Sequence, residues 1–175
     1  MARQGLKFAL KWTVLEIARA RDRHQEDAGE LRREAAAFES GRRIAAGNTE
    51  PESLTAIIHW KSSRPKGRIM TGNTPEEVFE ALRIAASAKQ GRTAVGVLCG
   101  LNGVGVPVAS AILTAIHPRR YTVIDWRALK ALGAKKSWLT VDDYLQYLGF
   151  CKERAAALGI SLRDLDRALW ILGME

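Results

Sequence analysis

The sequence has little that would place this protein in a membrane, in a disulfide framework or around a metal cluster. Only two of its 175 residues are cysteine, Cys99 and Cys151, and no CxxC pair is present. The three histidines are scattered, so neither a zinc site nor an iron–sulfur cluster is expected. No apolar run approaches the roughly 20 residues of a membrane helix, and charges interrupt the 6–17 stretch. We therefore expect a cytoplasmic protein with reduced thiols and no metal.

Positive charge is what the chain has in excess. It contains 27 Lys and Arg against 19 Asp and Glu, which gives a formal net charge of +8. Such an excess suits a polyanionic partner without identifying it, because many basic proteins use their charge only to stay soluble. The apolar share of 47% and the charged share of 26% are typical of a globular domain. The length suits one domain or two small lobes that share a core.

Apolar residues recur at helical spacing along almost the whole chain, and no segment alternates like a strand. The first periodic segment contains Leu6, Leu10, Val14 and Ile17, and a more charged helix follows it. Asn73-Thr74-Pro75 is a typical helix start, and Thr140 and Ser161 each begin an Asp version of the capping box. We predict an all-α, bundle-like single domain over 1–175, with two helical lobes, a cleft between them and C-terminal helices within 140–173.

The most informative segment is a glycine turn between two short helices. One predicted helix ends before 100–103, and the next begins beyond Gly105 and ends at His117-Pro118. Glycines at such a turn allow positive φ and leave no side chain between the backbone and a ligand. The following helix then presents unpaired amides to an anion. Val104 is predicted to plug the turn into the core. Such a turn by itself is also a common plain connection.

With its flanks, this segment resembles the helix-hairpin-helix motif of the DNA glycosylase superfamily that includes endonuclease III and the adenine mismatch glycosylases. The matching features lie within 93–132: Leu101 to Gly105, the Ala-rich helix Ala109 to Ile116, Pro118, and Val123-Ile124-Asp125. The resemblance implies that the hairpin grips a DNA backbone phosphate, in some relatives with a monovalent cation on its carbonyls and with no other required cofactor. The implied hairpin residues are Gly103, Val104, Gly105 and Val106.

Asp125 matches the catalytic acid of that superfamily. Breaking an N-glycosidic bond builds positive charge on the deoxyribose, and a fixed carboxylate stabilises that charge or orients the attacking water. The base must first leave the duplex. Asp125 also has the position of a plain N-cap for a helix over 126–129, and both roles can coexist. Bifunctional relatives carry a Schiff-base lysine where this chain has Pro107, so the resemblance implies a monofunctional enzyme.

A second set of candidates is basic and aromatic. Trp60 and the basic loop after it are predicted to track phosphates or support a base, with a buried Trp60 and a solvated loop as the equal alternative. We expect Trp126, Trp138 and Trp170 in the core, and the paired arginines at 32–33 and 42–43 on the solvated surface. The candidate DNA or base contacts are Trp60, Lys61, Arg64, Arg119, Arg120, Arg127 and Lys130.

These features favour a monofunctional DNA glycosylase that acts on double-stranded DNA carrying a modified, damaged or mismatched base. Two alternatives remain open. The chain would otherwise be a non-catalytic helix-hairpin-helix module that binds DNA through its backbone phosphates. In the third interpretation the hairpin only packs, and the protein is a helical scaffold for other proteins. The sequence does not identify the base, the residue that fills the gap in the duplex, or any protein partner.

Overall fold

In a computed structural model of the chain, which describes residues 6–62, 69 and 71–174, all regular structure is helical, as predicted. No helix of this described part is both long and apolar enough to cross a membrane. The elements are α1 (Val14–Glu26), α2 (Ala28–Ala45), the 3-10 helix η1 (Pro51–Leu54), α3 (Thr55–Lys61), α5 (Pro75–Ser87), α6 (Gly91–Cys99), α7 (Val106–Ile116), α8 (Trp126–Ala131), α9 (Val141–Leu158) and α10 (Leu162–Leu172).

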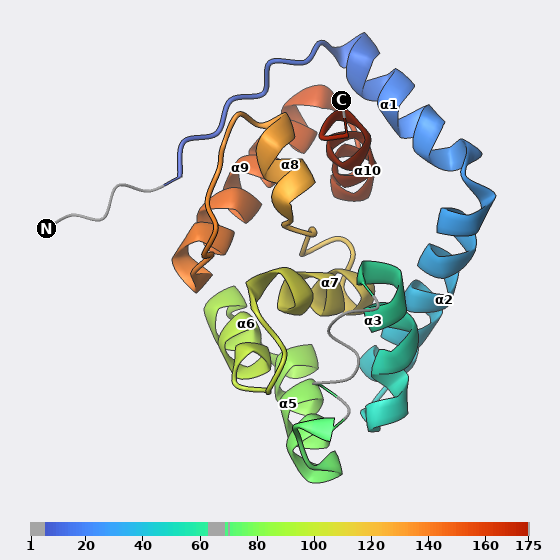
Figure 1. The fold of residues 1–175 in the computed structure, drawn as a ribbon, viewed down its shortest axis with the longest axis vertical. Coiled ribbons are helices and arrows are strands. Elements are labelled where there is room, and N and C mark those ends of the chain that lie inside the picture. Colours follow the sequence, from blue (N-terminus) through green and yellow to red (C-terminus); the bar gives the residue numbers. More distant parts are fainter. Residues whose placement is uncertain (1–5, 63–68, 70, 175) are drawn as a thin grey trace, which may run out of the picture.

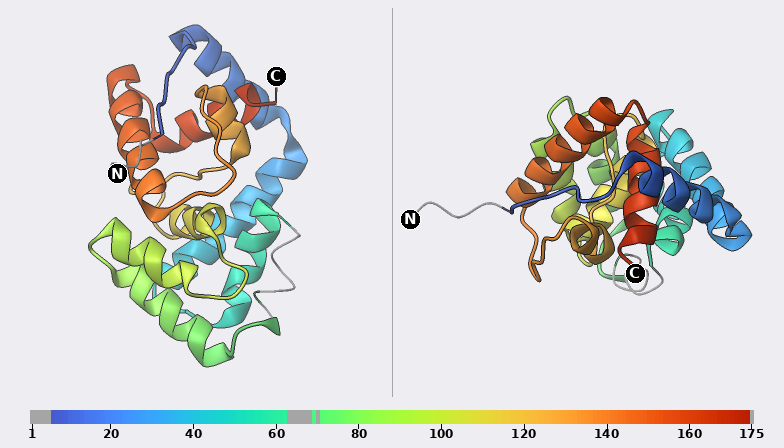
Figure 2. Two further views of the ribbon diagram at one scale, coloured as in Figure 1. Left: turned by 60° about the vertical axis from the view of Figure 1, so that its left-hand side comes forward. Right: turned by 90° about the horizontal axis from the view of Figure 1, so that it is seen from above.

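The helices form two lobes, which Figure 1 shows one above the other. Helices α1, α8, α9 and α10 make the upper lobe, where α10 packs on α1, α8 and α9. Helices α3, α5, α6 and α7 make the lower lobe, and α2 runs down beside both from the end of α1 to pack on α3 and α7. The side view in Figure 2 shows the same division. The predicted pair of lobes is therefore confirmed.

Helix α7 forms the centre of the core. Ten of its eleven residues are buried, which is why its sequence is almost wholly apolar instead of striped. Helix α2 crosses it so closely that a Cβ on Gly41 would lie 2.0 Å from the carbonyl oxygen of Ala115. Only glycine permits that approach. Because α7 follows the glycine turn directly, its tight packing also fixes the turn in space.

The first eight described residues correct the sequence prediction. We expected the helical spacing of Leu6 and Leu10 to continue into a helix, yet residues 6–13 are extended and α1 begins only at Val14. Thr13 caps that helix in a reciprocal box with Glu16. The extended segment instead lies along the upper lobe, where the Trp12 indole N–H donates to the Ala131 carbonyl at 3.0 Å. Contacts with the upper lobe therefore hold residues 6–13 extended, although their spacing alone favours a helix.

Most of the predicted helix starts are confirmed. Thr74 and Thr140 form reciprocal capping boxes with Glu77 and Asp143. The Ser161 hydroxyl accepts the backbone N–H of Asp164 and donates to the Asp164 carboxylate at 2.7 Å. Capping signals are local, so they survive any tertiary arrangement.

Candidate active site and nucleic-acid interface

The glycine turn has the predicted hairpin geometry, with one difference between its two glycines. Helix α6 ends at Cys99 and α7 begins at Val106. Gly103 has a φ of +81°, a conformation that side chains disfavour, whereas Gly105 has a φ of −90° that any residue adopts. Val104 is buried between the helices, as predicted, and Pro107 lies in the first turn of α7. Of the two glycines, only Gly103 therefore has a backbone conformation that requires glycine.

The hairpin is clamped by an asparagine pair that the sequence analysis missed. The Asn73 side-chain amide donates to the Asn102 carbonyl at 3.0 Å, and the Asn102 N–H donates to the Asn73 side-chain oxygen at 2.7 Å. The Asn102 side chain in turn donates to the Gly72 carbonyl at 2.5 Å. These bonds join the start of α5 to the turn, so the exposed turn has a defined shape without being buried.

The extended connector over 121–124 carries Asp125 back from the end of α7. Three buried hydroxyls hold its backbone. Ser110 of α7 accepts the Ile124 N–H at 3.1 Å, while Tyr144 and Tyr147 of α9 donate to the carbonyls of Thr122 and Val123, each at 3.0 Å. Burial raises the pKa of both phenols, which stay neutral donors. The connector is therefore positioned from both lobes.

Asp125 ends this connector and caps α8. Its Oδ1 accepts the Ala128 N–H at 2.9 Å, which confirms the predicted capping role. Its Oδ2 lies 3.1 Å from the Nζ of Lys61, the last residue of α3. The two side chains are 16% and 15% exposed, so each keeps a small area open to solvent. The structure thus places a carboxylate and an amine, 64 residues apart in sequence, side by side.

Both groups line an open groove of about 700 Å³ between the lobes. The first turn of α7, which directly follows the hairpin, contributes Pro107 and Val108 to the same groove. The start of α8 and the loop before α9 also line it. The lining residues are Glu30, Trp60, Lys61, Ser62, Pro107, Val108, Asp125, Trp126, Arg127, Leu129, Lys136, Ser137, Leu139 and Trp170. The first turn of α7, next to the hairpin, therefore shares one surface with the Asp125 carboxylate.

A narrow recess of about 50 Å³ adjoins the groove and shares five lining residues with it: Glu30, Trp60, Lys61, Asp125 and Trp170. It extends toward buried polar groups on α1 and α10. The added residues are His24, Val123, Ala128, Arg163, Asp166 and Arg167. A volume of about 50 Å³ is too small for a base, so a base would enter the recess only with movement of its walls.

The polar groups behind the recess form a buried charge network. Glu34 of α2 accepts hydrogen bonds from Arg163 at 2.6 Å and from Arg167, both on α10. Burial opposes ionisation of this carboxyl, yet the two arginines lower its pKa to about 2. His24 lies 3.9 Å from the same carboxylate, and burial, followed by the charge of Arg163, lowers its pKa. No local pattern in the chain indicated this cluster.

Asp166 connects the network to Asp125. It is buried and pairs with Arg163. Burial raises its pKa to about 6, the nearby Asp125 adds to the rise, and Arg163 and Lys61 oppose it. Two carboxyl groups with different environments therefore lie near one amine. Such pairs are typical of acid–base sites, although structural ion networks produce them as well.

Two tryptophans that line the recess pack against arginine side chains. The Arg163 guanidinium lies 5.0 Å from the ring centroid of Trp60, and that of Arg127 lies 4.4 Å from the ring centroid of Trp170. The expectation of buried tryptophans is wrong for two positions, because Trp126 is 65% exposed and Trp138 is 85% exposed. Helix α8 is short and its first residue projects outward, which the periodic pattern did not reveal.

The structure gathers some of the predicted contact residues and disperses others. Trp60, Lys61 and Arg127 line the groove. Lys130 is exposed on α8 outside the lining, and Arg64 lies outside the described residues. Arg120 donates to the carbonyls of Ala88 and Lys89, so it closes the end of α5. The paired arginines at 32–33 and 42–43 are exposed, as expected.

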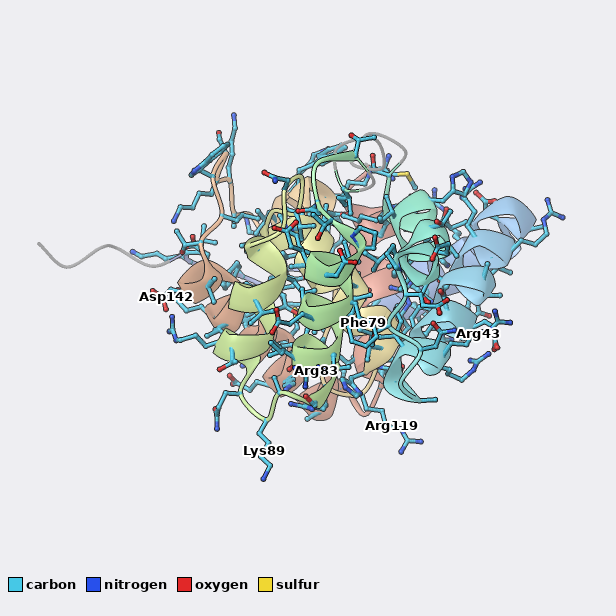
Figure 3. All side chains as sticks on the ribbon, turned by 90° about the horizontal axis from the view of Figure 1, so that it is seen from below. Arg43, Phe79, Arg83, Lys89, Arg119 and Asp142 are labelled. Carbon is cyan, nitrogen blue, oxygen red and sulfur yellow. The ribbon has the colours of Figure 1, made fainter. Side chains whose placement is uncertain are left out.

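Arg119 projects from the same edge of the molecule as Lys89 (Figure 3). It follows the C-terminal end of α7, whereas the hairpin precedes the N-terminal end, about 16 Å away along an 11-residue helix. Arg119 is therefore close to the hairpin in the sequence but is not among the residues that line the groove. In the described part of the chain, no group of three or more His, Cys, Asp or Glu side chains is arranged to hold a metal ion.

Comparisons with known proteins give a distant likeness. No family model matches the sequence, and no curated protein matches it significantly. Among solved structures, the chain is similar to an 8-oxoguanine glycosylase/lyase of Methanocaldococcus jannaschii, crystallised with a 15mer DNA containing 8-oxoguanine. The alignment covers 91% of this chain and 88% of that one, at 16% identity and a TM-score of 0.45. A likeness this distant says nothing of what the present chain acts on.

Proposed function

We propose that this protein binds double-stranded DNA through its hairpin and hydrolyses the N-glycosidic bond of an extruded modified, damaged or mismatched base. One observation carries the proposal. Pro107 and Val108, which directly follow the hairpin, line the same groove as Asp125. A strand anchored by the hairpin would therefore run past a fixed carboxylate.

Phosphate binding rests on the backbone at the start of α7. Gly103, Gly105 and Asn102 are exposed, and the Asn73–Asn102 bonds hold the turn in one shape. The first amides of a helix lack internal acceptors and carry a partial positive charge, which suits a phosphate oxygen. The net charge of +8 adds a general attraction for DNA. Affinity should accordingly fall steeply with salt.

Asp125 has the geometry for hydrolysis. Its Oδ1 is committed to the cap of α8, which fixes the side chain, and its Oδ2 lies at the groove beside Lys61. A carboxylate held in this way stabilises the positive charge that develops on the sugar and orients a water molecule toward C1′. The hairpin itself offers Pro107 where an amine would be needed, so water is the nucleophile of base release.

The groove also offers aromatic surfaces to nucleotides. Trp60 and Trp170 flank the recess beside Asp125, and Trp126 lies exposed at the groove. Bases stack on such rings without regard to sequence, with about 1–3 kcal/mol per base. These side chains are candidates to receive an extruded base or to replace it in the duplex.

No cofactor is needed for this chemistry. A monovalent cation on the hairpin stays a proposal. The carbonyl oxygens of Leu101 and Asn102 each already accept one hydrogen bond, from Val104 and from Asn73 respectively. Each carbonyl retains a second lone pair that would suit a cation.

The test is Asp125→Asn on a panel of duplexes that carry alkylated, deaminated, oxidised or mismatched bases, with alkali to cut at abasic sites. Asparagine caps helices as well as aspartate, so the variant should fold and bind DNA. Base release should fall by roughly 100-fold or more. Asp142→Asn is the matched control, because Asp142 is exposed at the start of α9 and pairs with Arg92. A fully active Asp125→Asn enzyme would refute the mechanism.

A second function is favoured by the small size of the recess and by the engagement of both Asp125 oxygens. The protein would then hold DNA by its phosphates without cutting it. It would show salt-sensitive binding that is indifferent to sequence, with each phosphate contact contributing about 0.9 to the salt slope. An abasic product from any duplex in the panel excludes this function. Failure to bind any DNA at low salt would instead favour the protein-binding scaffold.

A further inference from the structure

Lys61 is the one lysine that the structure pairs with Asp125 among the described residues. It ends α3, and its Nζ lies 3.1 Å from Oδ2 of Asp125, the residue that caps α8. Its side chain is only 15% exposed, and it lines both the groove and the recess. The hairpin, by contrast, carries no amine, since Pro107 occupies the corresponding turn.

Burying the ion pair between Lys61 and Asp125 costs free energy that a purely structural role would not repay. Burying an ammonium group requires compensation, and a single ion pair seldom repays it. The other buried cations in this protein, such as Arg163, meet their carboxylates through forked guanidinium groups. Lysine instead offers a compact amine that can release a proton and attack a carbonyl carbon. Lys61 therefore has the chemistry of a nucleophile more than that of a clamp.

We propose that Lys61 forms a Schiff base with the open-chain aldehyde of an abasic deoxyribose and so cleaves the DNA strand after base release. The position of the abasic site in the groove rests on the proposed function. The amine comes from α3, outside the hairpin, and Asp125 faces it as the partner that exchanges protons.

The step balances without an added co-reactant. Lys61 passes one proton to Asp125, and its neutral amine forms a bond to C1′ of the aldehyde. The carbonyl oxygen takes one proton from the amine nitrogen and one from Asp125 and leaves as water, which gives an iminium ion and restores the Asp125 carboxylate. That carboxylate then removes a proton from C2′, and the electron pair expels the phosphate from C3′, so the C3′–O bond breaks. Water finally hydrolyses the imine. This step returns the Lys61 amine and leaves the unsaturated sugar aldehyde at the 3′ end of the fragment that does not carry the expelled phosphate.

The experiment uses the full chain and a duplex in which a single abasic site has been prepared beforehand, so that it does not depend on base excision. Sodium borohydride reduces an imine to a stable amine and thereby traps a covalent protein–DNA complex. We expect a trapped complex, and peptide mapping should place the sugar on Lys61. A complex on any other lysine, or no complex while the abasic duplex is demonstrably bound, would overturn the proposal.

Variants separate the amine from its charge. Lys61→Arg keeps a cation for Asp125 but forms no imine, so it should fold, bind the abasic duplex and lose trapping and strand cleavage to background. Lys89→Arg is the matched control on an exposed loop and should trap like the parent protein. Trapping retained by Lys61→Arg would refute the assignment. Failure of base release with intact trapping would refute only the glycosylase, because the two assays use different substrates.

Discussion

The two sides of the groove are held in place by different forces. The side built from α7, the 121–124 connector and α8 is held by neutral hydrogen bonds from Ser110, Tyr144 and Tyr147 and by apolar packing. The side built from α2, α3 and α10 is held by a buried cluster of charges around Glu34. Trp60 and Arg163 stack across that cluster.

The two sides should therefore respond differently to pH and to the loss of a single side chain. Neutral hydrogen bonds keep their strength across the physiological pH range, so the Asp125 side has a fixed geometry. Buried ion pairs depend on full compensation, and loss of one partner leaves an uncompensated charge. The Asp125 carboxylate is therefore held by the side with neutral hydrogen bonds, while its partner Lys61 comes from the side with the buried charges.

The largest effect is expected from Glu34→Gln. The change leaves the guanidinium groups of Arg163 and Arg167 without their shared carboxylate, so the free energy of unfolding should fall by about 3 kcal/mol. Denaturant unfolding at neutral pH measures it. Glu39→Gln is the matched control on the same helix, since Glu39 pairs with Arg42 at the exposed surface, and it should change stability little. Equal losses in both variants would contradict the buried-network interpretation.

A smaller effect is expected from Ser110→Ala. The variant leaves the Ile124 N–H without its acceptor inside the core, at a cost of about 1–3 kcal/mol. Because that bond holds the connector before Asp125, base release should fall as well, with DNA binding retained. Thr114→Val is the control on the same helix, since the Thr114 hydroxyl only donates to the Ser110 carbonyl within α7. If both variants lose activity alike, the connector is not held in the way described.

The smallest effect concerns Asp166 and pH. Its pKa in the folded protein, about 6, lies above the usual 3.8, so the native state binds the proton more tightly than the unfolded chain. Stability from this group is therefore present below pH 4 and is lost as pH rises toward 6. Asp166→Asn mimics the protonated form and should gain stability relative to the parent over that window.

The measurement is the melting temperature of both proteins between pH 3.5 and pH 7.5. The difference between the two curves isolates Asp166, because Glu34, with a pKa of about 2, and His24, with a lowered pKa, act in both proteins. The groups that face Asp166 are Arg163, Asp125 and Lys61. Parallel curves across the window would show that Asp166 does not titrate there.

Much of the fold could be predicted because its signals are local. The capping boxes at Thr74 and Thr140, the hairpin at Gly103 and the cap formed by Asp125 all depend on residues within a few positions of one another. Such signals are read directly from spacing. The same reasoning failed at 6–13, where helical spacing was present and contacts with α8 and α9 produced an extended segment.

The candidate site shows the same limit. The glycine turn and the capping role of Asp125 were predicted correctly, while the clamp between Asn73 and Asn102 spans 29 residues and follows no local pattern. Arg119 was a predicted DNA contact, yet the length of α7 separates it from the hairpin. The exposure of Trp138 was also missed, because periodicity does not say which face of a short loop is covered.

The amino-acid sequence by itself determined the helical class, most of the helix starts and the glycine turn, since these follow from spacing and from the conformational freedom of single residues. Only the tertiary structure decided that Lys61 faces Asp125 and that Glu34 collects two arginines from a helix 129 and 133 positions away. Side chains so far apart in the chain meet through the packing of whole helices. That packing is set by the total buried apolar surface, which no local pattern encodes.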